Sequence, residues 1–119
     1  MIKSSIDSRT LEFACAMLKL LGHPVRLRIV ELLDGEGSLS VNQIVTALKE
    51  PQPSVSQHLN ALKVRGLLQS RRRDGQVFYQ VLLPQIGKLL DCIRGCCERE
   101  KRVSSVASGI LFVIVYLII

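Results

Sequence analysis

The residues of this chain that are best suited to chemistry are four cysteines, three of which lie close together at positions 92, 96 and 97. Cys92 and Cys96 are four residues apart, so on a helix they would lie one above the other. Their Cβ atoms would be about 6 Å apart, too far for an unstrained disulfide but close enough for both sulfurs to bind one ion. Cys97 would point about 100° away from Cys96. Because thiolates prefer soft ions, we predict that Cys92, Cys96 and Cys97 bind As(III), Sb(III), Cd, Hg or Zn.

The fourth cysteine, Cys15, lies far away in the sequence and leaves other interpretations open. It is a further candidate metal ligand, or it pairs with a C-terminal cysteine on oxidation. Alternatively, Cys15 and Cys97 are small buried hydrophobic residues, as free cysteine often is. Four cysteines, three of them clustered, are too few for a secreted disulfide scaffold, and the N-terminus MIKSSIDSRTLEF has no apolar signal region. We therefore expect a reducing, cytoplasmic location.

A second group of candidate residues lies in the segment SVSQHLNALKVR, which begins at Ser54. On a helical wheel, its three large apolar residues fall within about 60° of each other and face the core, so small polar residues form the outer face. Such a face suits the DNA major groove, where Gln and Asn pair with adenine edges, while Ser hydroxyls suit phosphates. An ordinary solvated helix is the alternative. The predicted DNA contacts of this segment are Ser54, Ser56, Gln57, His58, Asn60 and Lys63.

His58 lies at the border between the two faces of this helix. A partly buried histidine with a backbone partner is the stronger interpretation of His58, and a base contact is the weaker one.

A basic hairpin follows this segment, because LLQSRRR and QVFYQVLL flank an Asp-Gly pair that is typical of a two-residue turn. Arg71, Arg72 and Arg73 stand directly before the turn and Gln76 directly after it. Three exposed arginines can simply protect a sheet edge. Beside a recognition helix, we instead expect Arg71, Arg72, Arg73 and Gln76 to contact DNA phosphates or the minor groove.

The remaining patterns supply the elements that must position these residues. Helical periodicity, capping boxes and Gly or Pro punctuation predict five helices. The first two helices cover residues 8–21 and 24–33. The third is capped by the box Ser40–Gln43, and the fourth is capped by the box Ser54–Gln57 and ends near Gly66. The last helix runs from Pro84 to about Arg102. Two short helices separated by the stiff break at 50–53, followed by a hairpin, predict a winged helix-turn-helix. The fold class is mostly α with a β-hairpin wing (α+β): five helices plus a two-stranded wing.

Composition limits the function classes further. Sixteen Lys and Arg against ten Asp and Glu give a net charge of +6, which indicates a polyanionic partner. Aromatic residues make up only 4% and Trp is absent, so stacking platforms for single strands are not expected. The chain also has no phosphate-binding glycine loop, no hydrolase-type His cluster and no Ser-His-Asp set, so we do not expect an enzyme. A nonspecific DNA-packaging protein remains an alternative.

Two stretches, LGHPVRLRIVELL and QPSVSQHLNALKVRGLLQSRRRDGQVFYQV, resemble the ArsR/SmtB family of bacterial winged-helix repressors. The likeness covers residues 9 to 98. It implies a homodimer built through the first and last helices, an operator with an inverted repeat in double-stranded DNA, and an inducer ion or oxidant that lowers DNA affinity. The family's C-x-C cluster is absent from SLSVNQIV, and the last helix has Asp91 but no His for a zinc site. Adjacent cysteines resemble an arsenite-responsive subgroup, while Glu31 stands where redox-sensing members carry a cysteine.

The C-terminal end differs from the family pattern. We divide the chain into a DNA-binding and dimerisation domain at 1–102 and an apolar tail at 103–119, which contains no charged residue. The tail is at the lower length limit of a spanning helix, and the basic residues before it fit a cytoplasmic domain with a C-terminal anchor. A strand-like extension is the alternative.

From the sequence we therefore expect a cytoplasmic, nucleoid-associated transcriptional repressor that is released from its operator by a thiophilic inducer, with a C-terminal membrane tether left open. A redox or reactive-sulfur sensor of the same fold is the alternative.

Overall fold

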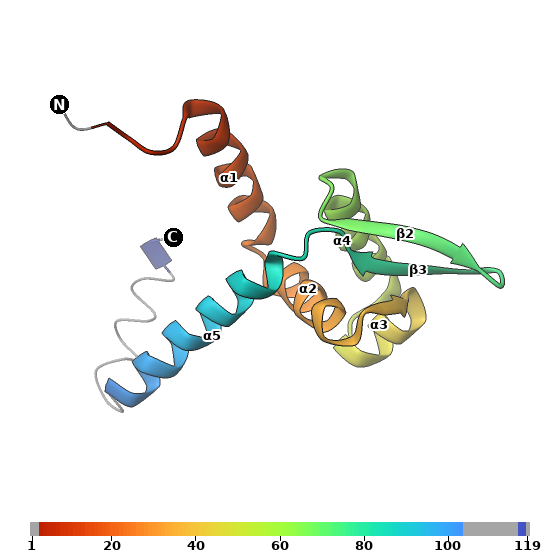
Figure 1. Ribbon diagram of the computed structural model, residues 1–119. Coiled ribbons are helices and arrows are strands. Elements are labelled where there is room, and N and C mark those ends of the chain that lie inside the picture. The colour runs from red at the N-terminus through yellow and green to blue at the C-terminus, as the bar shows by residue number, and fades with distance from the viewer. Residues whose placement is uncertain (1–2, 104–116, 119) are drawn as a thin grey trace. The chain divides into compact units, whose positions relative to one another are not determined.

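The structure is a computed structural model in which residues 3–103 and 117–118 are described. The chain divides into two compact units, Met1–Pro84 and Gln85–Ile119, which are described separately. The first unit contains α1, α2, β1, α3, α4, β2 and β3 (Figure 1). Their bounds are α1 Ser8–Leu21, α2 Pro24–Glu36, β1 Ser38–Ser40, α3 Val41–Leu48, α4 Gln52–Val64, β2 Leu68–Arg73 and β3 Gln76–Val81. The second unit contains α5, Ile86–Val103.

The ends of α2 follow from its flanking residues. Pro24 opens the helix, and the Nδ1 of His23 accepts a hydrogen bond from the Val25 N–H at 3.2 Å. The helix continues to Glu36, three residues beyond the predicted end at Leu33, so that predicted end was wrong. A glycine inside a helix costs only about 1 kcal/mol, so Gly35 is tolerated. The helix ends where Gly37 adopts a φ of 90°, a conformation that favours glycine.

The two predicted capping boxes had different outcomes. At α3, the box is confirmed: the Ser40 Oγ accepts from the Gln43 N–H at 3.2 Å, and the Gln43 Oε1 accepts from the Ser40 N–H at 2.9 Å. At α4, the box headed by Ser54 was wrong, because the helix begins two residues earlier, at Gln52, and has no side-chain cap. Pro53 fits into this first turn because backbone N–H groups there have no partner within the helix.

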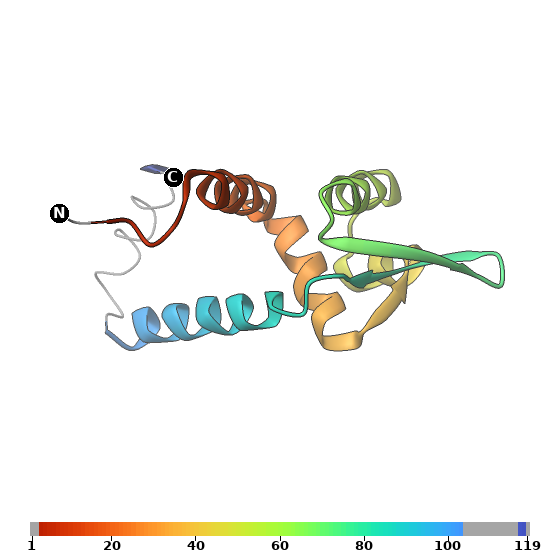
Figure 2. The same cartoon turned by 45° about the horizontal axis from the view of Figure 1, so that its top comes forward.

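The wing is part of a three-stranded antiparallel sheet with the order β1-β3-β2. The predicted hairpin is confirmed, with Arg73 paired to Gln76 across a turn in which Asp74 and Gly75 have φ values of 50° and 77°. Positive φ at both positions is typical of a type I′ turn. The third strand was not predicted, since β1 is only three residues long and forms by pairing with β3. Figure 2 shows the hairpin extending beyond the helices of its unit.

Helices α2, α3 and α4 enclose the core of the first unit together with the sheet. The three apolar residues predicted to face inward from α4, Val55, Leu59 and Leu62, are all fully buried. Ile29 of α2 and Ile44 of α3 are buried as completely. Because this face of α4 is held in the core, the opposite face is fixed in its orientation toward solvent.

The helix of the second unit was predicted, with a start two residues too early. Helix α5 begins at Ile86, because Pro84 and Gln85 form a turn before it, and it ends at Val103. Within the described residues, no helix is both long and apolar enough to cross a membrane. The predicted apolar tail at 103–119 lies almost wholly outside the described residues.

Candidate nucleic-acid interface

The outward face of α4 carries most of the predicted base-reading residues. Ser56, Gln57, Asn60 and Lys63 are exposed, whereas Ser54 is half-buried in the first turn. Gln57 and Asn60 are three residues apart, so they lie on neighbouring positions of one face. In the described part of the chain these two amides have no hydrogen-bond partner, and both can donate to and accept from base edges.

His58 has a different role from the one expected for a DNA contact. It is half-buried, and its Nδ1 accepts a hydrogen bond from the Arg26 Nε of α2 at 3.1 Å. Its ring also lies against the His23 ring, with centroids 4.4 Å apart. The expectation of partial burial is confirmed, but the partner is a side chain and not the backbone. The wheel of one helix shows no partner that lies 32 residues away, so sequence reasoning missed Arg26.

The surroundings of His58 favour its neutral form. Burial is the main cause that lowers the pKa of His58 below its ordinary value of 6.5, and the charges of His23 and Arg26 add to it, while Glu50 acts in the opposite direction. A protonated Nδ1 would also be unable to accept the hydrogen bond from Arg26. His58 is therefore an acceptor that connects α4 to α2, with its other nitrogen carrying the proton.

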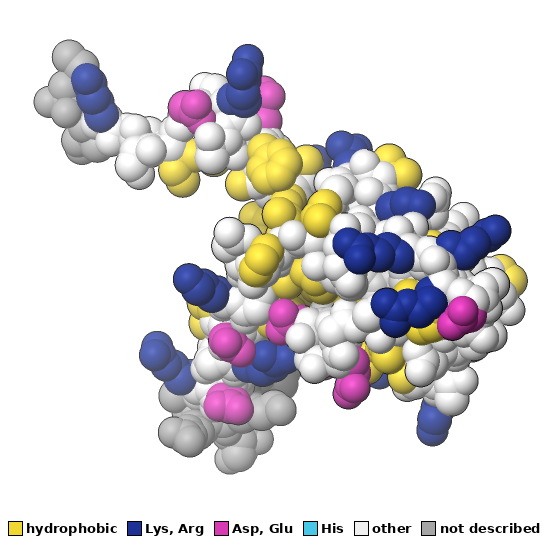
Figure 3. Space-filling model, turned by 45° about the vertical axis from the view of Figure 1, so that its right-hand side comes forward, with side chains coloured by type: hydrophobic (Ala, Val, Ile, Leu, Met, Phe, Trp, Pro, Cys, Tyr) yellow, Lys and Arg dark blue, Asp and Glu magenta, His cyan; other side chains and the backbone are white. Residues whose placement is uncertain are grey.

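The wing presents its arginines on two faces. Arg71, Arg72 and Arg73 are all exposed, as is Gln76. Side chains alternate along a strand, so Arg71 and Arg73 share one face and Arg72 lies on the other, with its register partner Val77. The view that brings the wing side forward shows Lys and Arg side chains gathered there (Figure 3). A basic strand hairpin beside an exposed polar helix has the charge that a DNA backbone requires.

The predicted thiol site is spread along α5. Cys92 and Cys96 are exposed and Cys97 is half-buried, while Cys15 is exposed on α1. Within the residues that the structure describes, no three His, Cys, Asp or Glu side chains come together as a metal site. A nearby arginine, Arg94, donates to Asp91 at 2.8 Å. Cys92 and Cys96 thus offer two sulfurs at helical spacing, and a third ligand requires Cys97 to be reoriented or another chain to take part.

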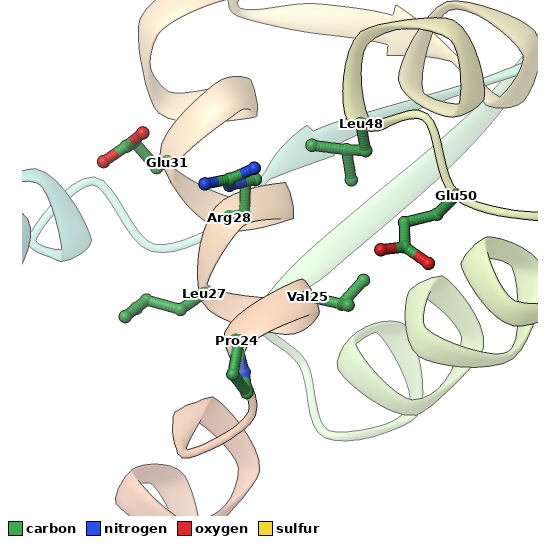
Figure 4. Close-up of a pocket in the computed structure, with 7 residues that line it drawn as sticks. All are labelled: Pro24, Val25, Leu27, Arg28, Glu31, Leu48 and Glu50. Atoms are coloured by element: carbon green, nitrogen blue, oxygen red, sulfur yellow. The ribbon is translucent and has the colours of Figure 1, made fainter. Parts of the chain in front are cut away.

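The described part of the first unit includes two open pockets, each with a volume of about 480 Å³. One lies between α2 and the end of α3, where Figure 4 shows Val25 and Leu48 near the carboxylate of Glu50. The other, which we call the basic pocket, lies between α1, Arg26 of α2 and the end of α4. Its lining residues are Glu12, Cys15, Ala16, Lys19, Leu20, Arg26 and Arg65.

Comparison with known proteins agrees with this geometry. The family model described as "Bacterial regulatory protein, arsR family" matches residues 23–70. An uncharacterized HTH-type transcriptional regulator of Methanocaldococcus jannaschii is 40% identical over 83 residues, which cover 67% of this chain and 93% of that protein. The chain belongs to the arsR family of bacterial regulatory proteins. As a member, it is a DNA-binding transcriptional repressor and not an enzyme.

Two further likenesses concern function and fold. The arsenical resistance operon repressor of Escherichia coli is 39% identical over 89 residues, which cover 71% of this chain and 74% of that protein. A homodimeric winged helix-turn-helix DNA-binding domain of Mycobacterium bovis, solved by NMR, superimposes with a TM-score of 0.68 at 26% identity, covering 82% of this chain and 90% of that one. The winged helix-turn-helix predicted from the sequence is thereby confirmed.

Proposed function

We propose that this repressor binds its operator as a homodimer and is released when a thiophilic ion, such as arsenite or a soft metal ion, binds its cysteines. The observation that carries the DNA-binding part is the exposed pair Gln57 and Asn60 on α4, beside the arginines of the wing. In this arrangement α4 lies in the major groove and the wing tracks phosphates. The residues that we assign to DNA are Ser54, Ser56, Gln57, Asn60, Lys63, Arg71, Arg72, Arg73 and Gln76.

The homodimer is supported by the apolar face of α1. Leu11 and Leu18 are seven residues apart and so lie on one face of this helix, where they are 53% and 60% exposed, which is unusual for large apolar residues. A second copy of the chain that covers this face would remove them from water. Two copies would also place two recognition helices on one operator, which fits an inverted repeat.

The inducer site is supported by the spacing and exposure of the cysteines on α5. Cys92 and Cys96 lie on one face of the helix and are accessible to an ion, and Cys97 is adjacent to Cys96. Each thiol must lose its proton before it binds a soft ion. Cys96 is central because it can join either of the other two sulfurs. The E. coli relative named for arsenical resistance supports the choice of arsenite as the first ion to test.

The experiment is a release titration on the protein's own promoter. Wild type and the variants Cys96→Ser and Cys15→Ser are bound to the DNA and titrated with arsenite, Cd(II) and polysulfide. We expect Cys96→Ser to bind DNA as wild type does, because α4 is unchanged, but to resist release by arsenite or Cd(II). If Cys96→Ser responds to every ion as wild type does while Cys15→Ser abolishes a polysulfide response, the redox mechanism replaces the metal one.

A further inference from the structure

The basic pocket brings together three cations from three separate parts of the chain. Lys19 comes from α1, Arg26 from α2, and Arg65 follows the last residue of α4. Among the residues that the structure describes, none of the three forms an ion pair, and Glu12 is the only carboxylate in the pocket lining. Three unpaired cations that face one cavity repel each other, and an anion placed between them relieves that repulsion.

The position of α1 explains why these charges gather there. The pocket residues Glu12, Cys15 and Lys19 recur at spacings of three and four, so they form the polar face of this helix. The exposed apolar residues Leu11 and Leu18 lie on a different part of the helix surface. A partner chain that covers the apolar face therefore leaves the polar face, and with it the pocket, open to small molecules.

The chemistry of the lining selects the ligand class. Arg presents a planar set of N–H donors that matches the oxygens of phosphate, and Lys adds a point charge. A volume of about 480 Å³ exceeds what a bare phosphate ion needs and is in the usual range for small-molecule sites. From these features we infer that the basic pocket binds a small phosphate-bearing molecule, held by Lys19, Arg26 and Arg65.

Arg26 connects this pocket to the recognition helix. Its Nε donates to His58 of α4, which leaves its two terminal nitrogens for a ligand in the pocket. Because the guanidinium is rigid and planar, a ligand that draws the terminal nitrogens also moves the Nε relative to His58. His58 directly follows Gln57, so a ligand bound in the pocket affects the face of α4 that reads DNA. This inference does not rest on the proposed inducer mechanism, and it can be tested without DNA.

Binding is tested by NMR on the full chain labelled with ¹⁵N, titrated with inorganic phosphate and with methyl phosphate against sodium chloride at matched ionic strength. We expect saturable shifts at the Arg26 Nε and at Arg65 with either phosphate compound and none with chloride. A preference for methyl phosphate indicates a phosphate ester as the natural ligand, and a preference for inorganic phosphate indicates the free ion. Shifts that grow linearly without saturation, or equally with chloride, would overturn the site.

Substitutions distinguish a specific phosphate site from a general effect of positive charge. Arg65→Gln should raise the phosphate Kd about tenfold or more, as expected for one lost charged hydrogen bond. If Arg65→Gln folds poorly, Lys19→Gln, which changes a different element, provides an independent test of the loss of phosphate affinity. The matched control is Arg28→Gln, which removes the same charge from α2 outside this pocket and should leave the Kd within about twofold. Equal effects of Arg28→Gln and Arg65→Gln would refute the inference.

Two further measurements test the coupling between the pocket and His58, and the alternative that these cations contact DNA. The His58 ring signals should shift on saturation in wild type but not in Arg26→Lys, which keeps the charge and loses the Nε donor. Unmoved His58 signals in saturated wild type would refute the coupling. If Arg65→Gln weakens DNA binding in phosphate-free buffer as strongly as a wing substitution does, these cations contact DNA and the proposal of a small-molecule site is wrong.

Discussion

Arg72→Ala is expected to reduce the salt dependence of DNA binding, whereas the same change at Arg71 or Arg73 is expected to have a smaller effect. Arg72 lies on the same face of β2 as the buried Leu68, and we expect α4 to pack on that side of the sheet because it contacts β2. A duplex that contacts the outer face of α4 lies on that side too. Arg71 and Arg73 point to the other side of the sheet.

The size of the effect follows from counterion release. Each phosphate contact contributes about 0.9 to the slope of log Kd against log salt concentration. If Arg72 makes one such contact, the affinity ratio of wild type to variant falls about threefold to fourfold between about 50 mM and about 200 mM salt. The ratio should be similar for operator and random DNA, because a phosphate contact carries no sequence information.

The measurement is fluorescence anisotropy with labelled operator and random duplexes at five salt concentrations. Arg71→Ala and Arg73→Ala are the matched controls, since each removes the same charge from the same hairpin. The expected slope change is about one unit for Arg72→Ala and less than half of that for each control. Three equal slope changes would show that the hairpin contributes only its total charge, and would refute the assignment of Arg72 to the DNA side.

Three other outcomes are expected. Gln57→Ala should lose about 1–3 kcal/mol of discrimination at one base position, measured by competition with single-base operator variants, and uniform weakening at all positions would contradict base reading by Gln57. Ser40→Ala should lower the free energy of unfolding in urea by about 1 kcal/mol because it removes the cap of α3, whereas Ser54→Ala should change it much less because Ser54 caps nothing. Because the pKa of His58 is lowered in the folded protein, the stability that neutral His58 supplies is complete above its ordinary value of 6.5 and is lost as the pH falls through the folded value. Urea unfolding between pH 5 and pH 8 should show this loss in wild type and a smaller one in His58→Gln, and equal losses would contradict it.

Local patterns predicted the elements and much of the site. The period of Val55, Leu59 and Leu62 oriented α4 correctly, and the Asp-Gly pair located the turn of the wing. The errors arose where two local signals compete or where a contact is long-range. The segment before Ser54 contains two acceptable helix starts, and the motif alone cannot choose between them. Strand β1 exists because Leu39 pairs with Tyr79, forty residues away in the chain.

The same reason applies to the chemistry around His58. A helical wheel placed this residue at the border between the two faces of α4, which is where it lies. Its hydrogen bond with Arg26 and its ring contact with His23 depend on how α2 packs against α4, and sequence spacing carries no information about that packing. The basic pocket could not be predicted from the sequence for the same reason, because its three cations come from α1, from α2 and from the residue that follows α4.

The exposed apolar side of α1 has a consequence for gene regulation. If two copies must associate there before both halves of an operator are filled, the active species scales with the square of the free chain concentration when copies are scarce. A modest rise in synthesis then produces a disproportionate rise in repression, and dilution at cell division relieves it sharply. Leu11 and Leu18 would in this way set the copy number at which repression begins, without touching DNA or inducer.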